Sequence, residues 1–366
     1  MPCRQHTFIA IISLLCALAA APASAQTNGQ VRIQGVPIPE AGSSATVAPG
    51  GAILDLREEM RMFVQRISTY ARDLKPNFVV IAKNGLDLLV KRDATDETKT
   101  APARAYMRAI DGVMQEGLFF DEARAGRPFG APPLPDRQAQ MLAMADYARR
   151  SGLKVLTLDF GSDNKTVDEA RKQASERGFI SLVADTPSAE IFKLPAYPPR
   201  PPNENPNSVI SLNMVQNFAT VRNSGPYGQQ AQFALKMHDT NYDALMVEVF
   251  HGREPLSRQA VETLKYKKLG AKRLVFAYMN VGTAASYHYY WRANWREGSP
   301  YWINSPLRDD PDRYHVEYWN ADWQGVMSGN PNSYLYGIIA QGFDGVVLDG
   351  LDVYKFFEGG SEAEIQ

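Results

Sequence analysis

Short apolar runs rich in β-branched residues recur along the chain, and segments with helical spacing of apolar positions lie between them. Continuous apolar runs of this kind are typical of strands that are buried on both faces. Eight strands are predicted, at 78–81, 112–114, 155–158, 180–183, 209–212, 244–247, 274–277 and 346–348. Helices are predicted over 56–74, 136–151, 166–177, 228–238 and 257–268, with Asp136 placed to cap the second.

The alternation of strands and helices predicts the fold class α/β, as a single (β/α)8 barrel. A doubly wound open sheet shares this alternation, but the Gly-x-Gly-x-x-Gly turn after a first strand is missing. Only the segment 192–207 breaks the pattern. Its prolines fix φ and remove backbone donors, so it is stiff and extended. Four strand–helix units on either side cannot close two barrels, and we therefore expect a strap within one barrel over 52–360.

The first 25 residues have the pattern of a secretory signal peptide. Arg4 precedes an apolar run over 8–21, and Ala23-Ser24-Ala25 forms a small-residue cleavage site. A transmembrane anchor is the alternative, but the run is short for a span of ~20 residues. We expect the mature protein to be secreted or periplasmic and to have no membrane contact after cleavage.

The composition of the mature chain narrows its chemistry. Residues 26–51, rich in Gly, Ala and Ser, are expected to form a flexible leader. Both cysteines, Cys3 and Cys16, fall in the signal segment, which leaves no thiol chemistry for the mature protein. A net charge of −1 and the lack of a basic stripe disfavour nucleic acid as a partner. The histidines lack metal-ligand spacing and no Gly-x-Ser-x-Gly motif occurs, so we expect no metal and no cofactor. The oligomeric state stays open.

Polar residues stand where several predicted strands end. Because the active site of such a barrel lies at the carboxyl ends of its strands, these residues are candidates for one shared site. They are Asn84, Glu116, Asp159, Asn213, Glu248, Tyr278, Asn280, Asp349 and, three positions further on, Asp352. A structural role, such as bracing a loop, is the alternative for each acid. Two carboxylates at one mouth are what glycoside hydrolysis requires.

We expect Asp349 and Glu248 to form the acid pair and Glu116 to be a reserve acid. Two carboxylates that lie close together in a site poor in water disfavour double ionisation, so one of the pair is expected to have a raised pKa. Asn84, Asp159 and Asp352 are expected to contact substrate.

All five tryptophans fall between residues 291 and 323, in the connection between the seventh and eighth strands. This connection overhangs the expected site, and aromatic faces stack on sugar rings. We expect Trp291 and Trp319, together with Tyr278 and Asn280, to line substrate subsites. The alternative is that the rings pack the long connection onto itself.

Several segments resemble glycoside hydrolase family 114, in the bacterial and archaeal branch related to endo-α-1,4-polygalactosaminidase. They are YDALMVEVF, FAYMNVGTAASYHYYW, VEYWNADWQ and GFDGVVLDGLDVY, and also ISTYARDLKPNFVVIAKNG and IDGVMQEGLFF. The resemblance implies a barrel glycosidase in which Asp349 matches the strand-end aspartate of the family and Asp352 matches its second aspartate. Glu248 stands where most members have Asp, and AKNG replaces the usual PQNG.

The order of these segments differs from that of the family. The last two quoted segments follow the others in the family but precede them here, so the sequence resembles a circularly permuted barrel. The resemblance implies an exported enzyme that cleaves an amino-sugar (galactosamine-containing) polysaccharide by a two-carboxylate mechanism. Two acids of the family are missing between Thr283 and Ser286. A non-catalytic carbohydrate-binding barrel and an exopolysaccharide assembly protein are the alternatives.

Overall fold

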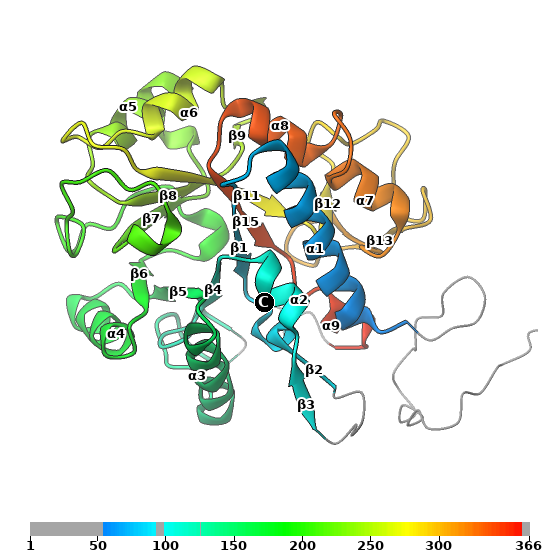
Figure 1. Cartoon of the computed structure of the whole chain (residues 1–366), viewed down its shortest axis with the longest axis horizontal. Helices are drawn as coiled ribbons and strands as arrows, with labels where there is room; N and C mark the ends of the chain where they lie inside the picture. Colours follow the sequence, from blue (N-terminus) through cyan, green and yellow to red (C-terminus); the bar gives the residue numbers. More distant parts are fainter. Residues whose placement is uncertain (1–53, 93–98, 125, 361–366) are drawn as a thin grey trace, which may run out of the picture.

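Eight parallel strands form the centre of the molecule (Figure 1). The computed structural model describes residues 54–92, 99–124 and 126–360; the predicted signal peptide and the whole of the predicted leader lie outside them. The strands are hydrogen-bonded in the order β6-β5-β4-β1-β15-β11-β8-β7, which makes a nearly closed (β/α)8 barrel. Their bounds are β1 Val79–Lys83, β4 Gly112–Glu116, β5 Lys154–Phe160, β6 Ile180–Ala184, β7 Phe218–Val221, β8 Ala244–Val247, β11 Leu274–Asn280 and β15 Gly345–Asp349.

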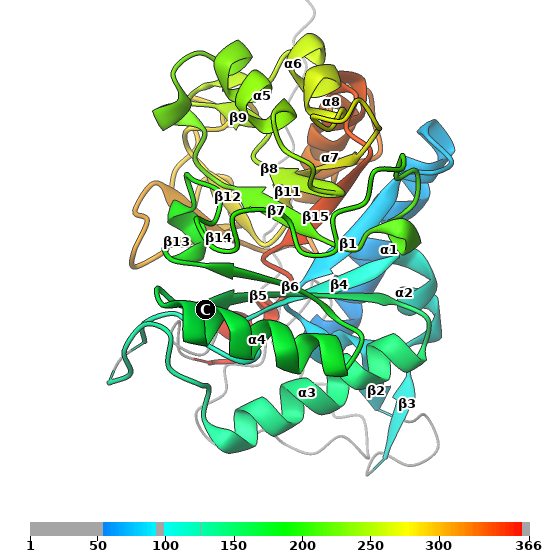
Figure 2. The same cartoon turned by 90° about the vertical axis from the view of Figure 1, so that its left-hand side faces the viewer.

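Helices cover the outside of this barrel (Figure 2). They are α1 Leu56–Leu74, α2 Arg104–Ala109, α3 Pro135–Arg150, α4 Asn164–Glu176, α5 Gln230–His238, α6 Arg258–Leu264, α7 Ala321–Met327, α8 Tyr334–Gln341 and α9 Tyr354–Phe357. The five predicted helices are confirmed, whereas α2, α7, α8 and α9 were not predicted. Asp136 does not cap α3, because the helix begins one residue earlier at Pro135 and Leu134 occupies the N-cap position.

The connections between the barrel strands and the helices contain smaller elements of secondary structure. Two hairpins pair β2 (Val90–Arg92) with β3 (Thr100–Pro102) and β9 (Phe250–His251) with β10 (Glu254–Pro255). A three-stranded sheet of β12 (Thr283–Ala285), β14 (Arg313–Val316) and β13 (Ile303–Pro306) lies in the connection from β11 to β15. Single 3₁₀ turns are η1 Leu86–Leu89, η2 Ser188–Glu190, η3 Leu212–Met214 and η4 Gly225–Tyr227.

The strands bury alternate residues in two different cores. On β15, Val347 joins the cluster inside the barrel, whereas Val346 and Leu348 pack outward against the helices. Successive side chains of a strand point to opposite faces, so this parity continues to the strand ends. Asp349, two residues beyond Val347, therefore faces the interior at the carboxyl end of the barrel.

The fifth strand is not where the hydrophobic pattern placed it. Residues 209–212 are no strand; β7 is Phe218–Val221. Val209, Leu212 and Val215 instead join the inner cluster, where they close the barrel at the amino ends of the strands. Val209 N–H donates to the carbonyl of Lys272, two residues before β11 begins. Asn213 lies at the amino end of the barrel, opposite to the expected site. Its carbonyl accepts a hydrogen bond from the ammonium of Lys154, which begins β5.

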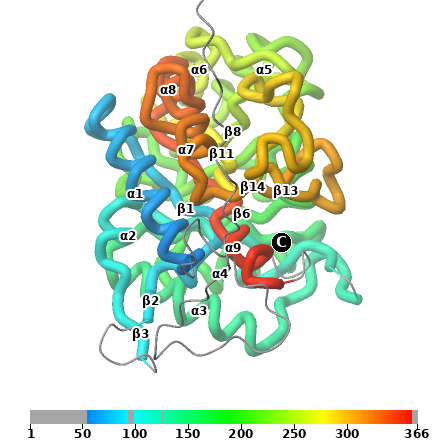
Figure 3. Tube along the Cα trace, turned by 90° about the vertical axis from the view of Figure 1, so that its right-hand side faces the viewer, coloured from blue at the N-terminus to red at the C-terminus, as the bar shows by residue number. Residues whose placement is uncertain are grey.

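The sheet is continuous across the two ends of the described chain. β1 and β15 are parallel neighbours with Val80 opposite Val346, which confirms that the first and last strands of the chain pair. Helix α1 lies beside the C-terminal segment (Figure 3). The Arg57 guanidinium binds both carboxylate oxygens of Glu358 at 3.0 Å. Helix α1 thus fills the position between β15 and β1.

The proline-rich strap takes the place of a helix between β6 and β7. It leaves the carboxyl end of the barrel at Ile191, whose carbonyl accepts from Arg222 N–H and Asn223 N–H. It reaches the amino end at Asn207 and Val209. None of its residues from 192 to 207 is buried, so the strap adds little to the core. Over the described part of the chain, no helix has both the length and the apolarity to cross a bilayer.

Candidate active site

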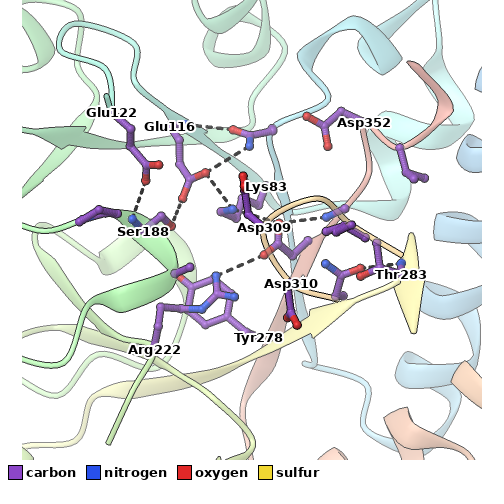
Figure 4. A pocket seen from close by; sticks show the side chains of 18 of the residues that line it. Lys83, Glu116, Glu122, Ser188, Arg222, Tyr278, Thr283, Asp309, Asp310 and Asp352 are labelled. Carbon is purple, nitrogen blue, oxygen red and sulfur yellow. Dashed lines mark hydrogen bonds and ion pairs between the residues drawn. The ribbon is translucent and has the colours of Figure 1, made fainter. Parts of the chain in front are cut away.

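A pocket of about 890 Å³ lies at the carboxyl ends of the barrel strands (Figure 4). This is the end at which barrel enzymes carry their active sites. Seven of the residues expected to form the site line it: Asn84, Glu116, Glu248, Tyr278, Asn280, Asp349 and Asp352. The structure therefore brings together acids that lie as far as 236 positions apart, Glu116 and Asp352.

Asp349 is the centre of a row of alternating charges. The Lys83 ammonium lies 3.0 Å from Asp349 Oδ1, and an Arg222 guanidinium nitrogen lies 3.2 Å from Oδ2. Both oxygens of the carboxylate thus contact a cation. The two cations come from the ends of β1 and β7.

A second and a third acid hold these cations in place. Lys83 Nζ also lies 2.8 Å from Glu116 Oε2, and Arg222 Nε lies 2.6 Å from Glu248 Oε1. Glu116, Asp349 and Glu248 stand at the ends of β4, β15 and β8, which are alternate strands of the sheet. Alternate strands contribute to the same layer inside a barrel, so the three carboxylates face one another across the mouth.

The row fixes the protonation state of its central acid. Burial alone would raise the pKa of Asp349, but the charges of Lys83 and Arg222 outweigh it and hold that pKa well below its ordinary value. Burial would likewise lower the pKa values of Lys83 and Arg222, and the neighbouring carboxylates raise them instead. Asp349 is therefore ionised at neutral pH, and the prediction of a raised pKa is wrong for this residue. It assumed bare carboxylates and did not foresee the cations between them.

Glu116 is surrounded by donors. Ser188 Oγ–H donates to its Oε1, and Asn84 Nδ2–H donates to Oε2 over 3.3 Å. Asn84 has a φ of 56°, a left-handed conformation that asparagine tolerates better than most residues. Its Oδ1 accepts from Glu116 N–H at 3.1 Å, which ties the end of β1 to the end of β4. Asn84 thus positions Glu116.

The ring of Tyr278 packs against the guanidinium of Arg222. The guanidinium carbon lies 3.9 Å from the centre of the Tyr278 ring, a cation–π contact. Tyr278 itself is buried, and its hydroxyl bonds Thr220 Oγ1 at 2.8 Å. Burial raises the pKa of Tyr278 to about 12, so it remains a neutral phenol. Its ring fixes the plane of the guanidinium that binds Asp349.

Asn280 and Gly350 shape the turn after β15. Asn280 Oδ1 accepts the backbone N–H groups of Gly282 and Thr283 at 3.1 and 2.9 Å. Gly350 has a φ of 72°, and a Cβ there would come within 2.6 Å of Asn280 Oδ1. Only glycine fits this position. Its N–H donates to Asp349 Oδ1 at 2.9 Å and adds to the anchoring of the carboxylate.

Asp159 does not reach the pocket. It lies between Leu158 and Phe160, which both face the barrel interior, so its side chain points outward. Asp159 Oδ1 accepts from Phe119 N–H at 2.7 Å and from Phe120 N–H at 3.1 Å. Complete burial raises the pKa of Asp159 to about 6. Asp159 braces the loop after β4. It was expected in the site because the prediction considered only which residues end a strand and not which face of the sheet they occupy.

The tryptophans pack against other residues of the connection between β11 and β15 and against α9. Trp291 stacks on Tyr314 with ring centres 5.2 Å apart, and Trp319 packs edge-on against Phe357 at 4.8 Å. Among the described residues that line the pocket there is no tryptophan. The same connection does supply Tyr287 and His288 to the wall of the pocket. The alternative interpretation of the aromatic cluster is thus the one that the structure supports.

Lys83, Arg222 and Ser188 were not predicted as parts of the site. The sequence carried a usable signal for the two cations. Ile81 and Thr220 occupy inward-facing positions of their strands. Lys83 and Arg222 each follow one of them by two positions, so their side chains point into the barrel as well. Ser188 lies in the loop after β6 and had no such signal.

Comparisons with known proteins agree with this architecture. Residues 215–365 match the sequence model of glycoside-hydrolase family GH114. An uncharacterized protein of Deinococcus radiodurans is 31% identical over 176 residues, which are 47% of this chain and 53% of that protein. An uncharacterized protein of Methanocaldococcus jannaschii is 27% identical over 152 residues, 41% of this chain and 42% of the relative.

The matched regions cover about half of these relatives or less. An uncharacterized protein of Thermotoga maritima, at 35% identity, aligns over 81 residues, 22% of this chain and 24% of its own length. The family match includes β7, β8, β11 and β15, and with them Arg222, Glu248 and Asp349. Residues 215–365 of this chain are thus similar to glycoside-hydrolase family GH114.

Proposed function

We propose that this protein is a glycoside hydrolase that cleaves an amino-sugar-containing polysaccharide in the pocket at the barrel mouth. The observation that carries the proposal is Asp349. It is an ionised carboxylate at the carboxyl end of β15, within the part of the chain that matches the family. Glycosidases need such a group to attack the sugar, to activate water or to stabilise the positive charge that develops on the ring.

Glu116 and Glu248 take supporting roles in this proposal. Each binds one of the two cations that contact Asp349. Removal of either acid would release Lys83 or Arg222 from its position and so alter the charge around Asp349. The pair expected from the sequence, Asp349 and Glu248, is joined through Arg222, and the reserve acid Glu116 is joined to Asp349 through Lys83. The substrate itself contacts Asp349.

The charge of the pocket supports a cationic sugar. Ten carboxyl groups and six lysine or arginine side chains line it. Asp309 lines the pocket with an exposed side chain, and Tyr287, which is 44% exposed, donates its hydroxyl to the adjacent Asp310 at 3.0 Å. An acidic rim with an exposed aromatic ring favours a polymer that carries free amino groups, since the ring stacks on sugar faces and the acids attract ammonium groups.

The decisive experiment measures new reducing ends released from α-1,4-linked galactosaminoglycan. We expect the parent protein to cleave the partly deacetylated polymer, and a fully N-acetylated sample to be cleaved more slowly. Asp349→Asn should bind the polymer and release no reducing ends. Export belongs to the same proposal and rests on residues 1–25; mass spectrometry of the secreted protein should find a chain that begins at Gln26.

One observation favours a second candidate function. Both oxygens of Asp349 contact cationic side chains of the protein itself, as they would in a barrel that retains the fold and only binds carbohydrate. Binding of the polymer without release of reducing ends, under conditions where the protein is folded, would support this candidate and reject the hydrolase.

A further inference from the structure

Among the acids of the pocket that stand outside the charged row, Asp352 lies nearest to Asp349 in the sequence. Asp352 follows Asp349 by three residues, in the turn between β15 and α9, and lines the same pocket. It is 8% exposed. No hydrogen bond or ion pair joins its carboxyl group to another side chain among the residues that the structure describes, and Figure 4 shows it beside the network of contacts without a link to it.

Glycoside hydrolysis by two carboxyl groups needs one that carries a proton. All three acids of the row are already engaged by the protein: Asp349 contacts two cations, Glu116 accepts bonds on both oxygens, and Glu248 binds Arg222. The two cations hold Asp349 in its ionised form. Asp352 has no contact of this kind and is therefore our candidate for the acid that carries the proton.

We propose that Asp352 is the proton donor to the glycosidic oxygen, with Asp349 as its ionised partner. This inference rests on the proposed function. The sequence led us to expect that Asp352 only contacts substrate, whereas here it takes part in the reaction. Glu116 and Glu248 are then not reacting acids but residues that position Lys83 and Arg222.

The surroundings of Asp352 support a carboxyl group that holds its proton. Burial raises its pKa to about 6, and the negative charge of Asp349 acts in the same direction, while Lys355 in α9 and Lys83 in β1 oppose both. The guanidinium of Arg137 in α3 also interacts electrostatically with Asp352. Two neighbouring carboxyl groups whose environments separate their pKa values are the usual basis for an acid and its ionised partner.

The reaction is balanced with these two groups. The bond between the anomeric carbon and the bridging oxygen breaks, and its electron pair stays on that oxygen, which takes the proton of Asp352. Water supplies the oxygen that ends on the anomeric carbon. The proton that this water loses passes to the carboxylate pair and restores protonated Asp352 beside ionised Asp349. The same balance holds whether Asp349 attacks the sugar or activates the water.

The test compares Asp352→Asn with the parent on two substrates, a natural oligosaccharide and an aryl glycoside whose phenolate leaves without a proton. On the oligosaccharide we expect kcat/KM to fall by roughly 10²–10⁴-fold. On the aryl glycoside the variant should retain most of the parent rate, which also shows that it folds. Parent kcat/KM on the oligosaccharide should decline by about tenfold per pH unit above about pH 6, and this decline should be missing in the variant.

The outcomes separate this inference from the function on which it rests. If the parent cleaves the oligosaccharide and Asp352→Asn keeps both its rate and its decline above pH 6, Asp352 is not the donor while the hydrolase stands. Equal losses on both substrates would also overturn the inference, because a proton donor is dispensable for the aryl glycoside. If the parent cleaves no substrate, the proposed function itself fails.

Discussion

Lys83 shows how a charged side chain can be kept at a nearly buried position. It is 6% exposed, and an isolated ammonium group there would be strongly disfavoured. Glu116 and Asp349 each lie within 3.0 Å of its nitrogen, which compensates the lost hydration. The same contacts lower the pKa of Asp349. The ionised state of the central acid thus depends on Lys83 as well as on Arg222.

Lys83→Gln tests this dependence. The change leaves Glu116 without its cation and Asp349 with Arg222 alone, so we expect the free energy of unfolding at pH 7 to fall by about 3 kcal/mol. A carboxyl group whose pKa is lowered by folding adds stability above its ordinary pKa of about 4 and loses it at lower pH. The difference in free energy of unfolding between parent and variant, measured with urea, should therefore be largest at pH 7 and decrease below about pH 4.

Lys268→Gln is the matched control. Lys268 pairs with Asp239 on the surface, where both side chains are more than half exposed, and its loss should leave stability unchanged. Equal effects of the two substitutions, or an effect of Lys83→Gln that does not depend on pH, would show that the cation does not set the state of Asp349.

At the scale of elements, the sequence predicted seven of the eight barrel strands because buried parallel strands are continuous apolar runs. The fifth failed because residues 209–212 have the same composition but plug the end of the barrel, whereas Phe218–Val221 is short. The site was predicted from strand ends alone. Side chains alternate between the inside and the outside of the barrel, and applying this alternation to each strand would have added Lys83 to the predicted site and removed Asp159 from it. Ser188 lies in a loop, where no such alternation exists.

The strap between β6 and β7 is anchored by one buried ion pair. Lys267 Nζ lies 2.6 Å from Asp243 Oδ1 and also donates to the carbonyls of Asn205 and Asn207 in the strap. Neither side chain of the pair is exposed. The pair therefore links the otherwise unburied strap to the amino end of the barrel.

Lys267→Met should remove this anchor. It leaves the Asp243 carboxylate buried and unpaired, which costs about 3–5 kcal/mol. We expect this loss in urea unfolding, together with faster protease cleavage within 192–207. Lys236→Met, at an exposed position of α5, is the control and should change neither quantity. A Lys267→Met protein as stable as the control would contradict the role given to the pair.

For the whole molecule, we propose that the barrel is circularly permuted relative to its family. The match to the family begins at residue 215, near the start of β7, and the segments that resemble the rest of the family precede it. The ends of the described chain meet at the contact of Arg57 with Glu358. Termini that lie close together make such a rearrangement tolerable, since no buried contact has to be broken.

Reversing the permutation tests the proposal. A chain that begins at 208, runs to 360, continues through a short flexible linker to 54 and ends at 191 should form the same barrel. We expect an unchanged circular dichroism spectrum and a single cooperative unfolding transition. An aggregated product, or one without cooperative unfolding, would show that the strap is required for folding and that the order of segments is not interchangeable.

The most direct test of a hydrolase built around Asp349 uses the two aspartates at opposite ends of β15. Asp349 ends the strand in the pocket, whereas Asp344 precedes it at the other end of the barrel, where it binds Lys75 and Lys265. Reducing-end release from the deacetylated polymer is measured for Asp349→Asn and Asp344→Asn beside the parent. We predict that Asp349→Asn loses at least roughly 10²-fold in rate while Asp344→Asn keeps the parent rate and loses only stability. Equal rates in Asp349→Asn and the parent would contradict the account.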